Sequence, residues 1–197
     1  AYVASGGAGL ALYVALWSIL ANLILPGDPS PLPYVPLLNP LDVAEGFAFA
    51  ALVGYAVHVQ RAGFALYAGV TQRAWLYLLA GLVFIWANAI LLRTIHHWTG
   101  VPFDLGEMLG SNVVQTSITI FWTVLALAAM LFATRHARRA VWITGAALLV
   151  VVVVKLFLVD LSRVGTVGRI VSFVGVGILM LIVGYFSPLP PAAREKE

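Results

Sequence analysis

Long runs of apolar residues dominate the sequence, and each is about as long as a helix that crosses a bilayer, roughly 17–25 residues. Six such runs cover, to within a few residues, 3–25, 41–60, 74–97, 113–134, 140–159 and 169–186. Inside hydrocarbon a backbone N–H or C=O without a partner is costly, so these runs are expected to be helices. A membrane barrel would instead show alternating polar and apolar residues. The sequence therefore predicts an all-α fold, a polytopic transmembrane bundle of about six membrane-spanning helices.

Composition supports a lipid environment and removes several functional classes. Hydrophobic residues make up 62% of the 197-residue chain and charged residues 10%, against about 25% charged in an ordinary soluble domain. There is no cysteine, which excludes disulfides and thiolate chemistry. The net charge is +3, but the basic residues are scattered between apolar runs and form no nucleic-acid-binding stripe. Membrane lipids are the expected partners, and neither nucleic acid nor a resident cofactor is predicted.

The basic residues predict an orientation, because Lys and Arg are enriched in cytoplasmic loops. If the loop from Arg135 to Arg139 is cytoplasmic, seven of the eleven basic residues fall on that side, and both termini are cytoplasmic. The prediction is a multi-pass protein of the bacterial inner (cytoplasmic) membrane. The acidic residues before Arg194 then fall at the outer, periplasmic side.

Titratable groups gather at this outer side in "LLRTIHHWTGVPFDLGEM", residues 91–108. On a helix Arg93 shares a side with His96 and His97, three and four residues later. Asp42 and Glu45 begin the second apolar run with the same spacing, so they are candidate partners for Arg93 or Lys155. Acidic residues in a first helical turn also stabilise the helix dipole, so Asp42 and Glu45 are equally compatible with capping alone.

A second group lies at the end of the fifth run and just after it, in "VVVVKLFLVDLSRVGTVGRI". Charges in a membrane segment are expected to be paired or to line water. The alternative is that each basic side chain reaches the lipid headgroups separately. The candidate ligand-binding residues are Arg93, His96, His97, Lys155, Asp160, Arg163, Arg169 and Glu45. If the protein is an enzyme, the candidate catalytic residues are His96, His97, Lys155 and Asp160.

Sequence motifs give little support for a specific chemistry. Adjacent histidines do not match the spacing of a helical zinc site, so no metal site is predicted. No nucleophile elbow, phosphate-binding loop or dinucleotide-binding glycine pattern occurs in the required context. Small residues in membrane helices favour close helix packing, which is expected at Gly175, Gly177 and Gly184.

The stretch from Arg93 to Arg139, followed by "VVKLFLVDLSRVGTVGRIVSF", resembles the C-terminal part of a bacterial family of predicted membrane proteins catalogued as domain of unknown function 2339. The resemblance covers residues 91–190, and "KLFLVDLS" followed by "RIVSF" is its most specific part. It implies a longer parent chain with more membrane helices, of which residues 1–197 would be a C-terminal portion forming one transmembrane domain. It implies no activity and no catalytic residues.

The leading functional hypothesis is a binding or structural module of a cell-envelope assembly, with a polar pocket at the periplasmic face. Its partners would be lipids, other membrane subunits or the remainder of its own chain. The alternative is an enzyme acting on a lipid-linked or glycan substrate, with His96 or His97 as general base. A second alternative is a small-solute or ion transporter, which the lack of a charged residue deep in any run disfavours.

Overall fold

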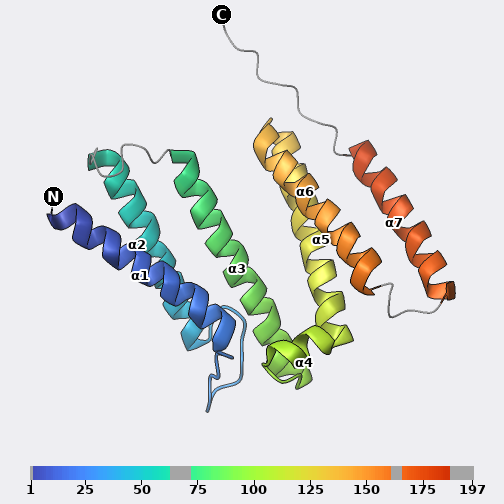
Figure 1. Cartoon of the computed structure of the whole chain (residues 1–197), viewed down its shortest axis with the longest axis horizontal. Coiled ribbons are helices and arrows are strands. Elements are labelled where there is room, and N and C mark those ends of the chain that lie inside the picture. Colours follow the sequence, from blue (N-terminus) through green and yellow to red (C-terminus); the bar gives the residue numbers. More distant parts are fainter. Residues whose placement is uncertain (1, 63–71, 161–165, 187–197) are drawn as a thin grey trace, which may run out of the picture. The chain divides into compact units, whose positions relative to one another are not determined.

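The structure, a computed structural model, describes the backbone of residues 2–62, 72–160 and 166–186, and the side chains of these residues except 2–5, 72–73, 160, 166–173, 183 and 186. Every regular element in this part of the chain is helical (Figure 1). The elements are α1 (Tyr2–Ile24), α2 (Pro40–Ala62), α3 (Gln72–Thr99), α4 (Leu105–Gly110), α5 (Asn112–Arg135), α6 (Arg139–Lys155), the π-helix η2 (Leu156–Asp160) and α7 (Thr166–Phe186). The all-α prediction is confirmed.

Each of the six predicted apolar segments corresponds to one long helix. Five helical stretches are long and apolar enough to cross a membrane: Gly6–Ile24, Pro40–Ala62, Ala74–Thr99, Asn112–Arg135 and Arg139–Val159. The sixth segment corresponds to α7. The short α4 and the π-helical turn η2 were not predicted.

Local sequence signals explain where several helices begin and end. The Asn39 side chain accepts hydrogen bonds from the backbone N–H groups of Leu41 and Asp42, both at 3.0 Å, and so caps α2. Pro40 occupies the first helical position, where its missing N–H costs nothing. Gly100 follows α3 with φ +77°, a left-handed conformation that ends a helix without strain in glycine.

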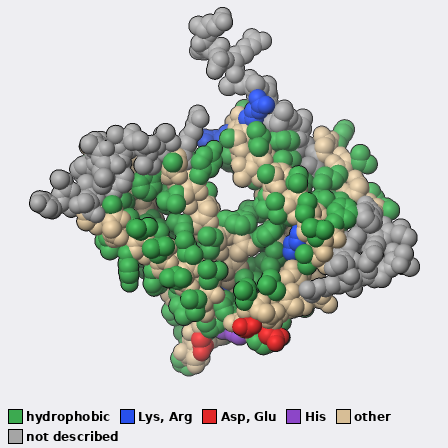
Figure 2. All heavy atoms as spheres, viewed as in Figure 1, with side chains coloured by type: hydrophobic (Ala, Val, Ile, Leu, Met, Phe, Trp, Pro, Cys, Tyr) green, Lys and Arg blue, Asp and Glu red, His purple; other side chains and the backbone are tan. Residues whose placement is uncertain are grey.

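The chain divides into two compact units, residues 1–109 and 110–197. In unit 1, helices α1, α2 and α3 all contact one another and lie side by side in Figure 1. Their shared core contains Phe49, Leu52 and Leu82, against which Trp86 packs. Large apolar side chains elsewhere on these helices are exposed, such as Leu10 and Leu78, and green hydrophobic side chains cover much of the visible face in Figure 2. This surface suits lipid as the surrounding medium.

In unit 2, α5 and α6 form the closest helix pair. Ala126, Met130 and Leu149 form its buried core. Gly145 allows the close approach, because a Cβ there would lie 2.8 Å from Met130 Cγ and 3.0 Å from the Ala126 carbonyl oxygen. The described residues do not show the close packing predicted at Gly175, Gly177 and Gly184, since a Cβ built at any of them meets no heavy atom within 4 Å beyond the adjoining backbone of its own helix.

Candidate functional site

Arg93, near the end of α3, is the central residue of a buried polar cluster in unit 1. Its side chain is fully buried and its guanidinium makes four hydrogen bonds. Nη1 donates to Asp42 Oδ1 at 2.7 Å, and Nη2 donates to Asn22 Oδ1 at 2.9 Å. Nε and Nη2 also donate to the carbonyl oxygens of Leu25 and Ala21, at 3.2 and 3.4 Å. One side chain of α3 therefore binds both the last turn of α1 and the first turn of α2.

The carbonyls of Ala21 and Leu25 belong to the end of α1, where the last turn of a helix leaves its C=O groups without partners in the helix. A positive charge is favourable there, because a helix carries partial negative charge at its C-terminus. Gly27 makes room for the approach. Its φ is +66°, and a Cβ there would lie 3.3 Å from both Arg93 Cδ and Asn39 Oδ1.

Asp42 is the charged partner of Arg93, and the pair is fully enclosed, with both side chains at 0% exposure. Its two oxygens accept four hydrogen bonds. Oδ1 accepts from Arg93 and from Trp86 Nε1, the latter at 3.2 Å. Oδ2 accepts from the Asn39 side-chain amide and from the Leu37 backbone N–H. Because every contact stabilises the ionised carboxylate, the pair meets the condition under which a buried ion pair is tolerated.

Glu45 lies one turn further along α2 and is also fully buried. Its carboxyl group contacts α1: the Ser18 hydroxyl lies 2.5 Å from Oε2, and Asn22 Nδ2 lies 3.2 Å from Oε1. Asn22 therefore donates to Glu45 and accepts from Arg93, which joins the two acidic side chains into one network. We call Ser18, Asn22, Asn39, Asp42, Glu45 and Arg93 the buried cluster.

The two histidines bond to main-chain carbonyls rather than to one another. His97 Nε2 lies 3.0 Å from the Pro26 carbonyl oxygen, and His96 Nδ1 lies 2.7 Å from that of Val101. Because a carbonyl oxygen only accepts, each of these ring nitrogens carries a proton and donates it. His97 also stacks on Tyr34, with ring centroids 4.3 Å apart. Burial raises the pKa of the Tyr34 hydroxyl, an effect that the nearby Thr94 hydroxyl reduces.

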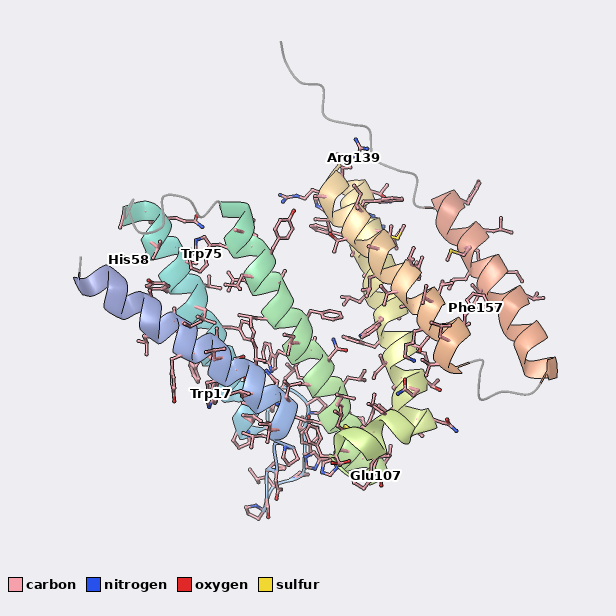
Figure 3. The ribbon with its side chains drawn as sticks, in the orientation of Figure 1. Trp17, His58, Trp75, Glu107, Arg139 and Phe157 are labelled. Carbon is pink, nitrogen blue, oxygen red and sulfur yellow. The ribbon has the colours of Figure 1, made fainter. Side chains whose placement is uncertain are left out.

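An open pocket of about 420 Å³ lies outside the buried cluster, where the α1–α2 loop meets the end of α3. Its lining combines a carboxylate, an imidazole, a phenol and an indole with a proline-rich stretch of backbone. The lining residues are Asp28, Pro29, Ser30, Pro31, Leu32, Pro33, Tyr34, His97 and Trp98. Acidic side chains and histidine appear together at this end in Figure 2, and Figure 3 shows Glu107 on α4 and His58 toward the opposite end of α2.

Lys155 belongs to unit 2, as the last residue of α6 before the π-helix η2. Its Nζ donates to the Thr119 hydroxyl at 2.8 Å and to the Gln115 carbonyl at 3.1 Å, both on α5. The widened turn of a π-helix often marks a functional position in a membrane or soluble helix. The side chains of Asp160, Arg163 and Arg169 lie outside the described residues.

Part of the predicted arrangement is found and part stays a prediction. The Arg93–Asp42 pair is confirmed. The spacing predicted that Arg93, His96 and His97 share one side of the helix; Arg93 and His97 both reach the end of α1, whereas His96 turns to the loop after α3. Glu45 joins Arg93 through Asn22. A pocket that also includes Lys155, Asp160, Arg163 and Arg169 stays a prediction.

Several residues of the site were not predicted. Ser18 and Asn22 are isolated polar residues in an apolar run, Trp86 lies within the run 74–97, and Asn39 lies between two runs. A signal was present for the first two, because their spacing of four places both on one side of α1. Among the described residues, no group of three His, Asp or Glu side chains is arranged to hold a metal ion.

A family model described as "Predicted membrane protein (DUF2339)" matches residues 1–190. The resemblance found in residues 91–190 is thereby confirmed and extends over nearly the whole chain. No curated protein and no solved structure matches the sequence.

Proposed function

The chain belongs to the DUF2339 family of predicted membrane proteins, and from that premise we propose that it is a structural module of a larger multi-pass assembly in the bacterial inner membrane. In this proposal the buried cluster fixes the periplasmic end of α1, α2 and α3, and both termini are cytoplasmic. The module presents an ordered outer face to its partners, which are lipids and other membrane segments.

One observation carries this proposal: the fully buried Arg93 guanidinium bonds to α1 and α2 from α3. All four hydrogen bonds described for this guanidinium go to groups of the protein itself. A guanidinium that served to attract an anionic headgroup would have to leave these partners, and the Asp42 charge would then stay buried without compensation. That loss costs about 3–5 kcal/mol for a buried pair. The geometry thus favours a structural role for Arg93 over a ligand-binding one.

The same geometry weakens the enzymatic alternative. In an enzyme, Arg93 or Lys155 could stabilise developing negative charge on a substrate, yet the Arg93 side chain has no exposed surface. His96 and His97 each donate a hydrogen bond from one ring nitrogen to a main-chain carbonyl. This bond orients the ring, but general-base catalysis also requires a nucleophile within reach of the other nitrogen. A transporter would need polar groups that are free to bind its solute, and the fully buried Arg93 and Asp42 already bond to groups of the protein itself.

The test compares Arg93→Ala with Arg61→Ala, an exposed arginine on α2. Each variant is expressed in its native membrane with an affinity tag, and the membrane proteins that co-purify are quantified. We expect Arg93→Ala to lose the co-purifying partners and to lower the thermal unfolding temperature in detergent, while Arg61→Ala retains both. Unchanged stability and unchanged partners in Arg93→Ala would contradict a structural role for the cluster.

A double substitution of His96 and His97 by alanine separates the enzymatic alternative. In a deletion strain with a measurable phenotype, a folded double variant that still co-purifies its partners should complement the deletion if the protein is a structural module. Failure of such a variant to complement would show that the histidines contribute more than structure, through catalysis or through ligand binding.

A further inference from the structure

We propose that the open pocket beside His97 binds an alkylammonium group, the positively charged end of an amine. This proposal goes beyond the structural role of the buried cluster, because none of the six cluster residues lines the pocket. A zwitterionic phospholipid headgroup and a soluble amine both supply this chemistry, and the lining favours the lipid.

The charge of the lining favours a cation. Nine described residues line the pocket. One of them, Asp28, is acidic, and none is lysine or arginine. Asp28 is exposed, and its Oδ1 accepts a hydrogen bond from the Ser30 backbone N–H at 2.9 Å. This bond orients the carboxylate, which has further lone pairs for a ligand N–H donor. Arg93 in the same unit is already paired with Asp42 in the buried cluster.

The aromatic side chains favour an ammonium over a metal cation. Trp98 lines the pocket and is 67% exposed, and indole is the side chain that binds ammonium groups best through its ring face. The stacked Tyr34 and His97 rings form a second part of the wall. A carboxylate beside aromatic rings is the combination by which proteins bind quaternary and primary ammonium groups, whereas hard metal cations require several oxygen ligands.

The apolar rim favours a lipid as the source of the ammonium group. Leu32 lines the pocket and is 69% exposed, and Leu38 in the same loop is 74% exposed. The loop joins α1 to α2 and therefore lies at a membrane surface, where headgroups and the first methylene groups of the acyl chains meet. Leucines at this depth suit the glycerol and acyl region of a lipid whose headgroup occupies the pocket.

The experiment measures lipid selection by native mass spectrometry. The full chain is equilibrated with mixed micelles that contain equal amounts of phosphatidylethanolamine and phosphatidylglycerol with identical acyl chains, and the ratio of the two bound lipids is recorded. We expect the wild-type chain to prefer phosphatidylethanolamine. Equal binding, or a preference for phosphatidylglycerol, would overturn the proposal.

Asp28→Asn tests the carboxylate with little change of shape, because asparagine can still accept the hydrogen bond from Ser30. Asp104→Asn is the matched control: Asp104 is also exposed, and its Oδ1 accepts from the Gly106 N–H at 2.9 Å. Loss of a charge-assisted hydrogen bond should reduce the preference about fivefold to tenfold in Asp28→Asn, with no change in Asp104→Asn. Trp98→Leu should reduce it about threefold. Equal ratios in Asp28→Asn and wild type would overturn the proposal, and circular dichroism verifies that each variant is folded.

Two competitors distinguish the source and the chemistry of the ligand. Displacement of the bound lipid by low concentrations of free ethanolamine would support the ammonium site but identify a soluble amine as its ligand. Resistance to ethanolamine would support the lipid. Displacement by glucose, which has no charge, would overturn the ammonium assignment in favour of a sugar site.

Discussion

Asp42 combines a favourable position at a helix start with an ion pair, while the capping role that the sequence also allowed for it belongs to Asn39. Its position in the first turn of α2 is favourable for the helix dipole, and its carboxylate also pairs with Arg93. The capping side chain is its neighbour Asn39, which bonds to the first free N–H groups of α2. The helix start and the ion pair are thus assigned to two residues three positions apart.

Asp42→Asn should strongly destabilise unit 1. The amide removes the charge that compensates Arg93 and places N–H donors where Asp42 now accepts from four groups. We expect the free energy of unfolding in detergent to fall by about 2–4 kcal/mol. Asp104→Asn, at an exposed position, should change it by less than about 0.5 kcal/mol. Equal stability of the two variants would contradict the network described for Asp42.

Tyr34 lies in the α1–α2 loop, and its raised pKa predicts an alkaline dependence of stability. The folded state holds the phenol proton to higher pH than the unfolded state does. The corresponding stabilisation is therefore fully present below the ordinary value of 10.0 and is lost as pH rises through the raised pKa. As pH rises from neutral to above 10, the free energy of unfolding, measured with denaturant, should fall less for Tyr34→Phe than for the wild type. A Tyr34→Phe profile identical to wild type would refute the effect.

The cluster was only partly predictable at this scale because its partners differ in kind. Charged residues stand out in an apolar sequence, and the positions of Asp42 and Arg93 at the outer ends of two apolar runs made them candidate partners. The main-chain carbonyls of Ala21 and Leu25 have no counterpart in the pattern of side chains, since any residue supplies a carbonyl. Their role depends on where α1 ends relative to α3, which is a tertiary property.

At the scale of elements, the six long helices follow from local information. The sequence alone predicts the helices from the lengths of the apolar runs. It also contains the signals that start α2 at Asn39 and Pro40 and end α3 at Gly100. The π-helix η2 interrupts an apolar sequence that contains no proline or glycine between Leu156 and Asp160. The sequence therefore contains no helix-breaking residue from which η2 could be predicted. Lys155, just before η2, bonds to Gln115 and Thr119 of α5. The sequence of one helix does not reveal such a contact between two helices.

Gly145 gives a prediction for the α5–α6 pair. Gly145→Ala places a Cβ 2.8 Å from Met130 Cγ and 3.0 Å from the Ala126 carbonyl, so the helices must separate slightly. We expect a loss of about 1–3 kcal/mol in unfolding free energy. Gly54→Ala is the control in α2, because its Cβ would meet no heavy atom within 4 Å, and the higher helix propensity of alanine should leave stability unchanged or raised. A neutral Gly145→Ala would show that the helix contact tolerates a wider spacing.

At the scale of the whole molecule, the proposed orientation can be tested without background labelling because the chain has no cysteine. Single cysteines replace Asp104, in the α3–α4 connection, and His136, after α5. A membrane-impermeant thiol reagent added to intact cells should label the cysteine at position 104 and leave the one at position 136 unlabelled until the membrane is opened. The reverse pattern would invert the proposed topology and place the alkylammonium pocket on the cytoplasmic side.

The position of Arg93 on the third long helix has a consequence for biogenesis. During synthesis α1 and α2 leave the ribosome before Arg93 exists, so Asp42 meets the membrane without its counter-ion. Inserting an uncompensated carboxylate is unfavourable, which predicts that the α1–α2 hairpin waits beside the insertion machinery until α3 emerges. Truncation after α2 should therefore yield a nascent chain that crosslinks to the translocon, whereas truncation after α3 should release it into lipid.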